Sequence, residues 1–149
     1  MRRLRRAAAG TLAAGCVLAA ACLSAGCSAP APPSLYERLG GDSAVSALVD
    51  AFVGKVLADD RIRSAFARTN IPRFKLMLID QLCAAAGGPC PYTGEDMKTA
   101  HRGRHIGAAQ FDAMMEDLAI SLDQLRVAAA ERRDVLAMAE SMRADIVQP

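Results

Sequence analysis

The sequence contains few aromatic residues, few histidines and no acidic residue near its start. Its 149 residues include no tryptophan, six phenylalanine and tyrosine residues, and two histidines. No acidic residue precedes Glu37, and beyond the four arginines near the start the chain holds 14 basic and 16 acidic residues, a net charge of −2. With no basic patch in this pattern, we expect no nucleic-acid partner. The length favours one domain, and an apolar content of 52% excludes intrinsic disorder.

The first 26 residues are predicted to be a signal peptide that directs export. Met1–Arg6 carries four arginines, and the 17 residues of Ala7–Leu23 are uncharged and rich in alanine and leucine. A charged start, an apolar centre and small residues before a cleavage point are typical of a secretory signal. The uncharged run is short for a transmembrane helix, which needs about 20 predominantly apolar residues.

A cysteine at the end of this segment is a candidate for lipid attachment. Leu23–Cys27 resembles a bacterial lipobox, in which a small residue precedes a cysteine that becomes acylated. Cys22 is a weaker candidate, and a conventional signal peptide or an uncleaved helix are the alternatives. Residues 27–33 then form a Pro- and Ala-rich tether, and residues 34–149 form the folded domain. The predicted location is the periplasmic face of a bacterial membrane, with the lipid on Cys27.

Two cysteines remain inside the folded domain. Export places Cys83 and Cys90 in an oxidising compartment, where disulfides persist. A disulfide closing so short a loop contributes on the order of 2–3 kcal/mol. The alternative is a pair of free thiols. A zinc site is disfavoured because six residues separate the two cysteines, whereas zinc motifs use a tighter spacing.

The domain is predicted to be all-α, because apolar residues recur at helical spacing and no alternating strand pattern is convincing. The first long helix is expected to be capped by Asp42 or Ser43. Pro72 suits the first turn of the third helix, and Gly87-Gly88 would end it. The expected elements are a helix that follows the cap at Asp42 or Ser43 and ends near Asp59-Asp60, a helical turn at 61–66, a helix from Ile71 to the glycine pair, a short helix through Met97 and His101 that ends near Gly103, and helices at 108–125 and 129–146.

Both histidines lie in one short segment. His101 and His105 are four residues apart, a spacing that could bind zinc or copper on one helix face, but Gly103 between them weakens that helix. The glutamate of the catalytic zinc motif His-Glu-x-x-His is also absent. Haem needs only one neutral imidazole on the iron and a dry pocket around the ring. A single histidine facing a Phe- and Leu-lined helix meets that requirement.

From Leu35 to about Val147 the chain resembles the group I truncated haemoglobins, the two-over-two helical globins. The resemblance rests on Tyr36–Gly41, on Val56–Asp60, on the glycine-rich loop Gly87–Gly94, on Met97–His101 and on Phe111-Asp112. It implies haem b as cofactor, with His101 as the proximal iron ligand. The other residues implied to line the haem pocket are Met97, Phe66, Phe74, Leu78, Ile106, Phe111 and Met114.

The distal side departs from the family pattern. Group I proteins usually carry a tyrosine on the first long helix and often a glutamine on the distal helix, and the corresponding positions here are Val53 and Leu78. Neither side chain can donate a hydrogen bond to a bound gas. Gln81 lies about one helical turn beyond Leu78 and could reach inwards or stay in solvent. His105 is expected to face water or a haem propionate.

The leading prediction is an exported haem globin that binds oxygen or another diatomic gas at iron ligated by His101, with an unidentified reductase as partner. One alternative is a haem enzyme for nitric-oxide or peroxide detoxification, although the apolar distal side offers no evident proton donor. Another is a haem-free helical interaction module. Gas binding is favoured over enzyme activity.

Overall fold

The computed structural model describes residues 31–148. The predicted signal peptide (1–26) and Cys27, the predicted site of lipid attachment, lie outside the described residues. The helices belong to one compact unit, Pro32–Pro149. They are α1 (Leu35–Leu39), α2 (Gly41–Ala58), the 3₁₀ helix η1 (Arg63–Phe66), α3 (Ile71–Ala85), α4 (Met97–His101), α5 (Ala108–Gln124), α6 (Ala129–Ser141) and α7 (Arg143–Ile146). Residues 31–148 contain no strand, which confirms the all-α prediction.

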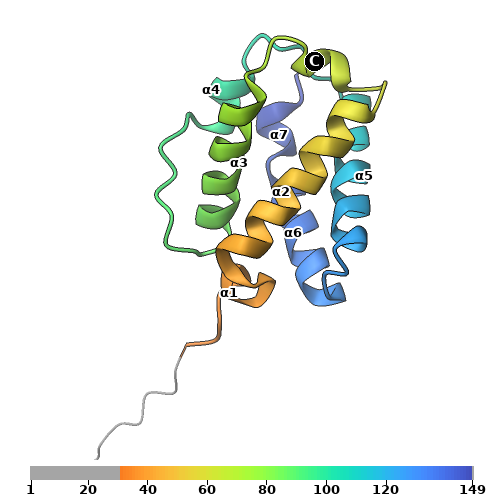
Figure 1. Ribbon diagram of the computed structural model, residues 1–149. Coiled ribbons are helices and arrows are strands. Elements are labelled where there is room, and N and C mark those ends of the chain that lie inside the picture. The colour runs from red at the N-terminus through yellow and green to blue at the C-terminus, as the bar shows by residue number, and fades with distance from the viewer. Residues whose placement is uncertain (1–30, 149) are drawn as a thin grey trace, which may run out of the picture. The chain divides into compact units, whose positions relative to one another are not determined.

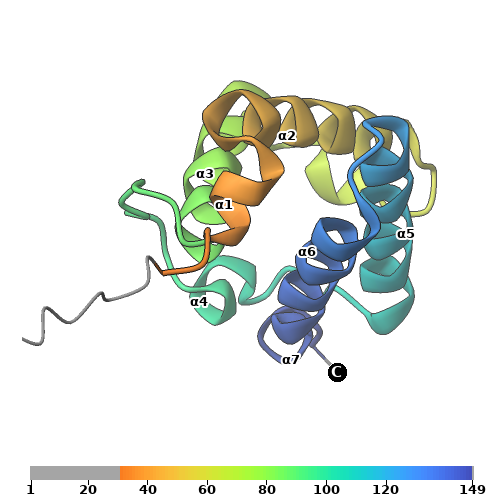
Figure 2. The ribbon, with the colours of Figure 1, turned by 90° about the horizontal axis from the view of Figure 1, so that it is seen from below.

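Four long helices form two pairs. α2 packs on α3, α5 packs on α6, and α2 joins the pairs by crossing α5 (Figure 1). Seen along the other direction, α3, α2, α5 and α6 surround a common interior, and α4 closes the side between α3 and α7 (Figure 2). The interior is apolar. Its buried core residues come from α2, α5 and α6 and from the turn after α2: Leu48, Val49, Phe52, Val53, Val56, Ile62, Ala113, Leu118, Leu122 and Val135. No helix in 31–148 has both the length and the apolar character that crossing a bilayer demands.

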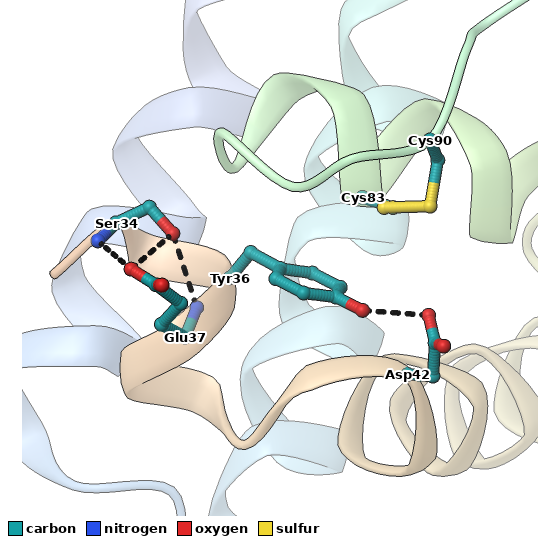
Figure 3. Close-up of a disulfide and its surroundings, with 6 residues drawn as sticks. All are labelled: Ser34, Tyr36, Glu37, Asp42, Cys83 and Cys90. Carbon is teal, nitrogen blue, oxygen red and sulfur yellow. Dashed lines mark hydrogen bonds between the residues drawn. A yellow bond between two sulfur atoms is a disulfide. The ribbon is translucent and has the colours of Figure 1, made fainter.

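The start of the domain is fixed by a capping box. The Ser34 hydroxyl accepts a hydrogen bond from the Glu37 backbone N–H at 3.2 Å, and the Ser34 N–H donates to the Glu37 carboxylate at 2.7 Å (Figure 3). These bonds satisfy free N–H groups at the start of α1. Arg38 at the other end of α1 bridges to Glu131 at 2.8 Å and Asp134 at 2.6 Å, which attaches α1 to α6.

Two predicted helix boundaries are wrong. α2 begins at Gly41, immediately after Gly40 ends α1 in the left-handed region (φ +108°), so neither Asp42 nor Ser43 caps it. The Asp42 carboxylate instead accepts a hydrogen bond from the Tyr36 hydroxyl at 2.7 Å. That bond raises the pKa of Tyr36. A glycine pair allows this tight connection because a left-handed residue carries no steric penalty without a side chain.

The last predicted helix is also interrupted, since α6 ends at Ser141 and α7 begins at Arg143. Contacts made by Arg143, the first residue after the interruption, stabilise the bend between α6 and α7. The Arg143 guanidinium stacks 4.4 Å from the centroid of the Phe111 ring and pairs with Asp112 at 2.8 Å. It also binds Glu140. Contacts between distant helices therefore decide where this segment bends.

A disulfide joins Cys83 at the end of α3 to Cys90 in the following loop. The Cα atoms are 5.8 Å apart, within the range that a disulfide spans without strain, and the Cys83 side chain is fully buried. The Tyr36 ring lies beside this bond (Figure 3), and Gly88 separates them so closely that a Cβ there would be 2.6 Å from the Cys83 sulfur. The Asp42 carboxylate is also near, but sulfurs bonded to each other are not metal ligands.

One buried carboxylate lacks a partner. Asp117 on α5 is 6% exposed, and its Oδ2 makes no hydrogen bond to the described residues. Burial, with the charge of Asp59 adding to it, raises the pKa of Asp117 above its usual range. An acid with a folded-state pKa above the unfolded value costs stability as pH rises from the unfolded value through the folded one.

We therefore expect Asp117→Asn to raise the free energy of unfolding at neutral pH by about 1 kcal/mol, at the lower end of the cost of an unsatisfied buried group. The gain should shrink as the pH falls below about 4, the ordinary pKa of an aspartate, because Asp117 then becomes protonated in the unfolded chain as well. Urea unfolding at about pH 3 and pH 7 measures both. Asp145→Asn, at an exposed carboxylate, is the matched control. A gain of equal size at both pH values would contradict the explanation.

Candidate functional site

An apolar cavity of about 210 Å³ lies among α2, α3, α4, α5 and the α6–α7 segment. It contains every residue that the sequence predicted for the cofactor site: His101, Met97, Phe66, Phe74, Leu78, Ile106, Phe111 and Met114. The sequence pattern did not assign to the site a further group of lining residues, which come mainly from α2 and the C-terminal helices: Leu48, Val49, Ile62, Gln110, Leu118, Val135, Met138 and Met142. The apolar residues among them recur at helical spacing in the sequence, but this spacing is the same for the wall of a cavity and for a solid core.

His101 presents one ring nitrogen to this cavity. Its Nδ1 lies 2.8 Å from the Met97 carbonyl oxygen, one helical turn earlier on α4. A carbonyl can only accept, so Nδ1 carries the proton and Nε2 keeps its lone pair. Histidines that bind metals commonly donate a hydrogen bond from one ring nitrogen to a carbonyl, which orients the second ring nitrogen towards the metal. In the half-buried ring Nδ1 is therefore occupied by the backbone, and Nε2 is the nitrogen left to bind a metal.

The short helix α4 is held by capping at both ends. The Asp96 carboxylate accepts from the Thr99 N–H at 2.9 Å, and this bond lowers the pKa of Asp96. At the other end, Gln148 donates from its side-chain amide to the His101 carbonyl at 2.7 Å and accepts from the Gly103 N–H at 3.1 Å. Nothing in the sequence indicates that Gln148 caps α4, because this residue lies 47 positions after His101. These bonds fix the backbone that carries His101.

The α3 wall is aromatic and aliphatic. Phe74 and Leu78 line the cavity, and the Phe74 ring packs on Phe66 of η1 with the two centroids 5.5 Å apart. Val53, predicted to face the distal pocket, is 1% exposed in the core and does not line the cavity. Phe52, one residue earlier on α2, lies on the cavity wall. The α2 wall is thus apolar, as expected, but through a different residue.

Gln81 brings a polar amide into this apolar wall. Its Nε2 lies 2.9 Å from the Met97 sulfur and 3.6 Å from the Met142 sulfur, so the side chain points inwards rather than into solvent. Thioether sulfur is a weak acceptor, which leaves this donor poorly satisfied.

His105 does not line the cavity. Its side chain is exposed, and its backbone adopts the left-handed conformation with φ at +53°.

These features fit a haem. The porphyrin ring needs an apolar enclosure from which water is excluded, and the iron needs a neutral imidazole nitrogen. Phenylalanine, leucine and methionine side chains line the cavity, and the free Nε2 of His101 would supply the ligand atom. Gln110 is occupied locally, because its side-chain oxygen accepts from the Gly107 N–H at 2.7 Å.

Comparison with known proteins gives the family. The model of the bacterial-like globins matches residues 34–148. Over 116 residues the chain is 36% identical to the group 1 truncated haemoglobin of Tetrahymena pyriformis, covering 78% of this chain and 96% of that protein. The chain belongs to the group 1 truncated haemoglobins. Haem is accordingly its cofactor.

Other members of the family show the same relation. The group 1 truncated haemoglobin of Mycolicibacterium paratuberculosis is 41% identical over 91 residues, which cover 61% of this chain and 67% of that protein. The crystal structure of the Tetrahymena pyriformis protein in the Fe(III) form superposes with a TM-score of 0.75 at 35% identity, covering 78% of this chain and all of that one. The two-over-two haemoglobin of Synechococcus, solved in the cyanomet state with covalently attached haem, gives 0.74 at 33% identity, covering 77% and 98%. This truncated haemoglobin therefore has the predicted two-over-two fold.

Proposed function

We propose that this truncated haemoglobin binds dioxygen or another diatomic gas at haem iron held by Nε2 of His101. The observation that carries the proposal is the protonated Nδ1 of His101, bonded to the Met97 carbonyl, because it leaves one free nitrogen facing an apolar cavity. Bound haem supplies an iron atom that coordinates diatomic ligands. The protein holds the imidazole in one tautomer and excludes water with Phe66, Phe74 and Phe111.

The absorption spectrum of the freshly purified protein tests this directly. We expect an intense Soret band, a shift of that band when carbon monoxide is added to the reduced protein, and uptake of one haem per chain when the haem-free protein is titrated with haemin. A chain that takes up no haem would instead fit the alternative of a haem-free helical interaction module, and would refute the proposal.

Gln81 should affect which gas is retained. Haem pockets use hydrogen-bond donors to stabilise dioxygen, whereas carbon monoxide depends on them much less. Because the Gln81 amide has only thioether acceptors, we expect Gln81→Leu to speed dioxygen dissociation about two- to tenfold, the worth of one neutral hydrogen bond. Carbon monoxide dissociation should stay within about twofold. Laser photolysis and stopped-flow mixing measure both rates, with the exposed Gln124→Leu as control. Equal changes for both gases would contradict a hydrogen-bonding role.

We further propose that the protein is exported and tethered to the membrane by a lipid on Cys27. The arginine-rich start, the uncharged run and the lipobox-like Leu23–Cys27 support this proposal. A disulfide within the domain is also compatible with an oxidising compartment. Metabolic labelling with a palmitate analogue and membrane fractionation should give a labelled, membrane-bound protein. Cys27→Ser should lose the label and Cys22→Ser should keep it; the reverse pattern would assign the lipid to Cys22.

A further inference from the structure

We propose that five exposed cations beside the haem cavity form the docking surface for an acidic one-electron carrier protein that reduces the iron. We call this surface the cationic face: Arg68, Arg73, Lys98, Arg102 and Arg104. The proposal rests on the proposed function, since it concerns the partner of the same haem site.

The charge of the domain is segregated along the chain. Residues 61–106 hold eight basic and three acidic residues, whereas residues 31–60 hold two basic and five acidic, and residues 107–148 hold four basic and eight acidic. The nearly equal numbers of basic and acidic residues predicted no basic patch, but the segments that carry the cations of residues 61–106 border one end of the helical domain. Figure 1 shows the η1–α3 connection, α4 and the loop after α4 at the same, upper end of the helical domain.

The five cations differ from the other basic residues of this segment. Arg61, Arg63 and Lys75 are paired with carboxylates. The members of the cationic face are exposed and have no ion-pair partner among residues 31–148. The carboxylates near α4 include Glu95, Asp96, which is engaged as the cap of α4, and the exposed Asp145 on α7, the helix that packs on α4.

Each cation is within two residues in the sequence of a residue that lines the cavity. Arg73 adjoins Phe74, Lys98 adjoins Met97, and Arg102 adjoins His101. Arg68 and Arg104 are each two residues from a lining residue, Phe66 and Ile106 respectively. The two propionates of a haem can neutralise two of these charges, which leaves the majority for another anionic surface.

The partner follows from the chemistry of the site and its charge. Iron must be ferrous to bind dioxygen, so each ferric haem has to gain one electron, and a carrier loses that electron in the same step. Among residues 31–148 the sulfurs are thioethers or a disulfide, so the chain offers no internal donor. The folded domain as a whole is negative, with net charge −2, and repels an acidic protein except where cations gather. The cationic face therefore selects both the partner and the side from which it approaches.

Stopped-flow reduction of the haem-loaded ferric protein by a reduced plant-type [2Fe–2S] ferredoxin, an acidic one-electron carrier, tests the proposal. The second-order rate constant should fall as ionic strength rises from about 10 to 200 mM, because salt screens local attraction. At low salt, Arg73→Glu and Lys98→Glu should each slow the reaction about three- to tenfold. Both positions lie in the first turn of a helix, where glutamate is well tolerated. Arg133→Glu, an equal charge change on α6, should leave the rate within about twofold.

The outcomes separate the hypotheses. Equal effects in Arg73→Glu and Arg133→Glu, or a rate that rises with salt, would overturn the docking surface while the Soret band upholds the proposed function. Faster haem loss in Arg73→Glu with an unchanged ferredoxin rate would assign the cations to the haem propionates alone. Competition by a single-stranded oligonucleotide without a salt-dependent ferredoxin reaction would assign them to nucleic acid. A protein that takes up no haem would overturn both proposals.

Discussion

His101→Gly should lose haem at least about 100-fold faster than the native protein, beyond the 10- to 100-fold range expected when only an outer partner of a metal ligand is removed. His101 alone among the histidines lines the cavity, and its Nε2 is the free nitrogen there. Any haem that remains should show a shifted Soret band. Haem transfer to an excess of a haem-free acceptor globin measures the loss.

Free imidazole provides the decisive control for this prediction. Glycine leaves a space where the ring was, so added imidazole should restore the native spectrum if the ring acted only as a ligand. His105→Ala is the matched variant, because His105 is exposed and lies outside the cavity lining. We expect its spectrum and haem retention to be unchanged. An unchanged Soret band in His101→Gly, or a loss of haem in His105→Ala, would refute axial ligation by His101.

Removal of the disulfide should have the second large effect. Cys83→Ala/Cys90→Ala frees a loop of a few residues, and the entropy of that loop in the unfolded chain predicts a stability loss of about 2–3 kcal/mol. The melting temperature should fall by about 10 °C for a domain of this size. The disulfide joins the end of α3 to the loop that leads into α4, so the variant should also lose haem faster.

Reduction of the native protein offers an independent measurement of the same bond. Dithiothreitol should lower the melting temperature of the native chain towards that of the double alanine variant, and it should not change the variant itself. Thermal unfolding followed by circular dichroism records both. If the native protein melts at one temperature with and without reductant while mass spectrometry shows two free thiols, the bond does not stabilise the domain.

Local signals in the sequence account for much of the helical framework. Pro72 and the preceding Asn70 mark the start of α3, where the Asn70 side chain accepts from the Arg73 N–H at 3.1 Å. α4 starts after Asp96, and α5 ends one residue before the predicted limit. Caps and apolar periodicity act over a few residues, so they can be read without knowing the fold. The glycine-rich loops and the segment around His101 identified the family on the same local basis.

The sequence by itself therefore determined the helix content, the family and the cofactor, and it singled out the histidine that lines the cavity. Only the tertiary structure decided that Val53 is excluded from the cavity, that Gln81 turns towards Met97 and Met142, and that the last helix is interrupted at Met142. It also decided that the segments carrying five cations without an ion-pair partner among residues 31–148 lie at one end of the helical domain (Figure 1). These features depend on which distant side chains meet when the helices pack, and helical periodicity does not encode that information.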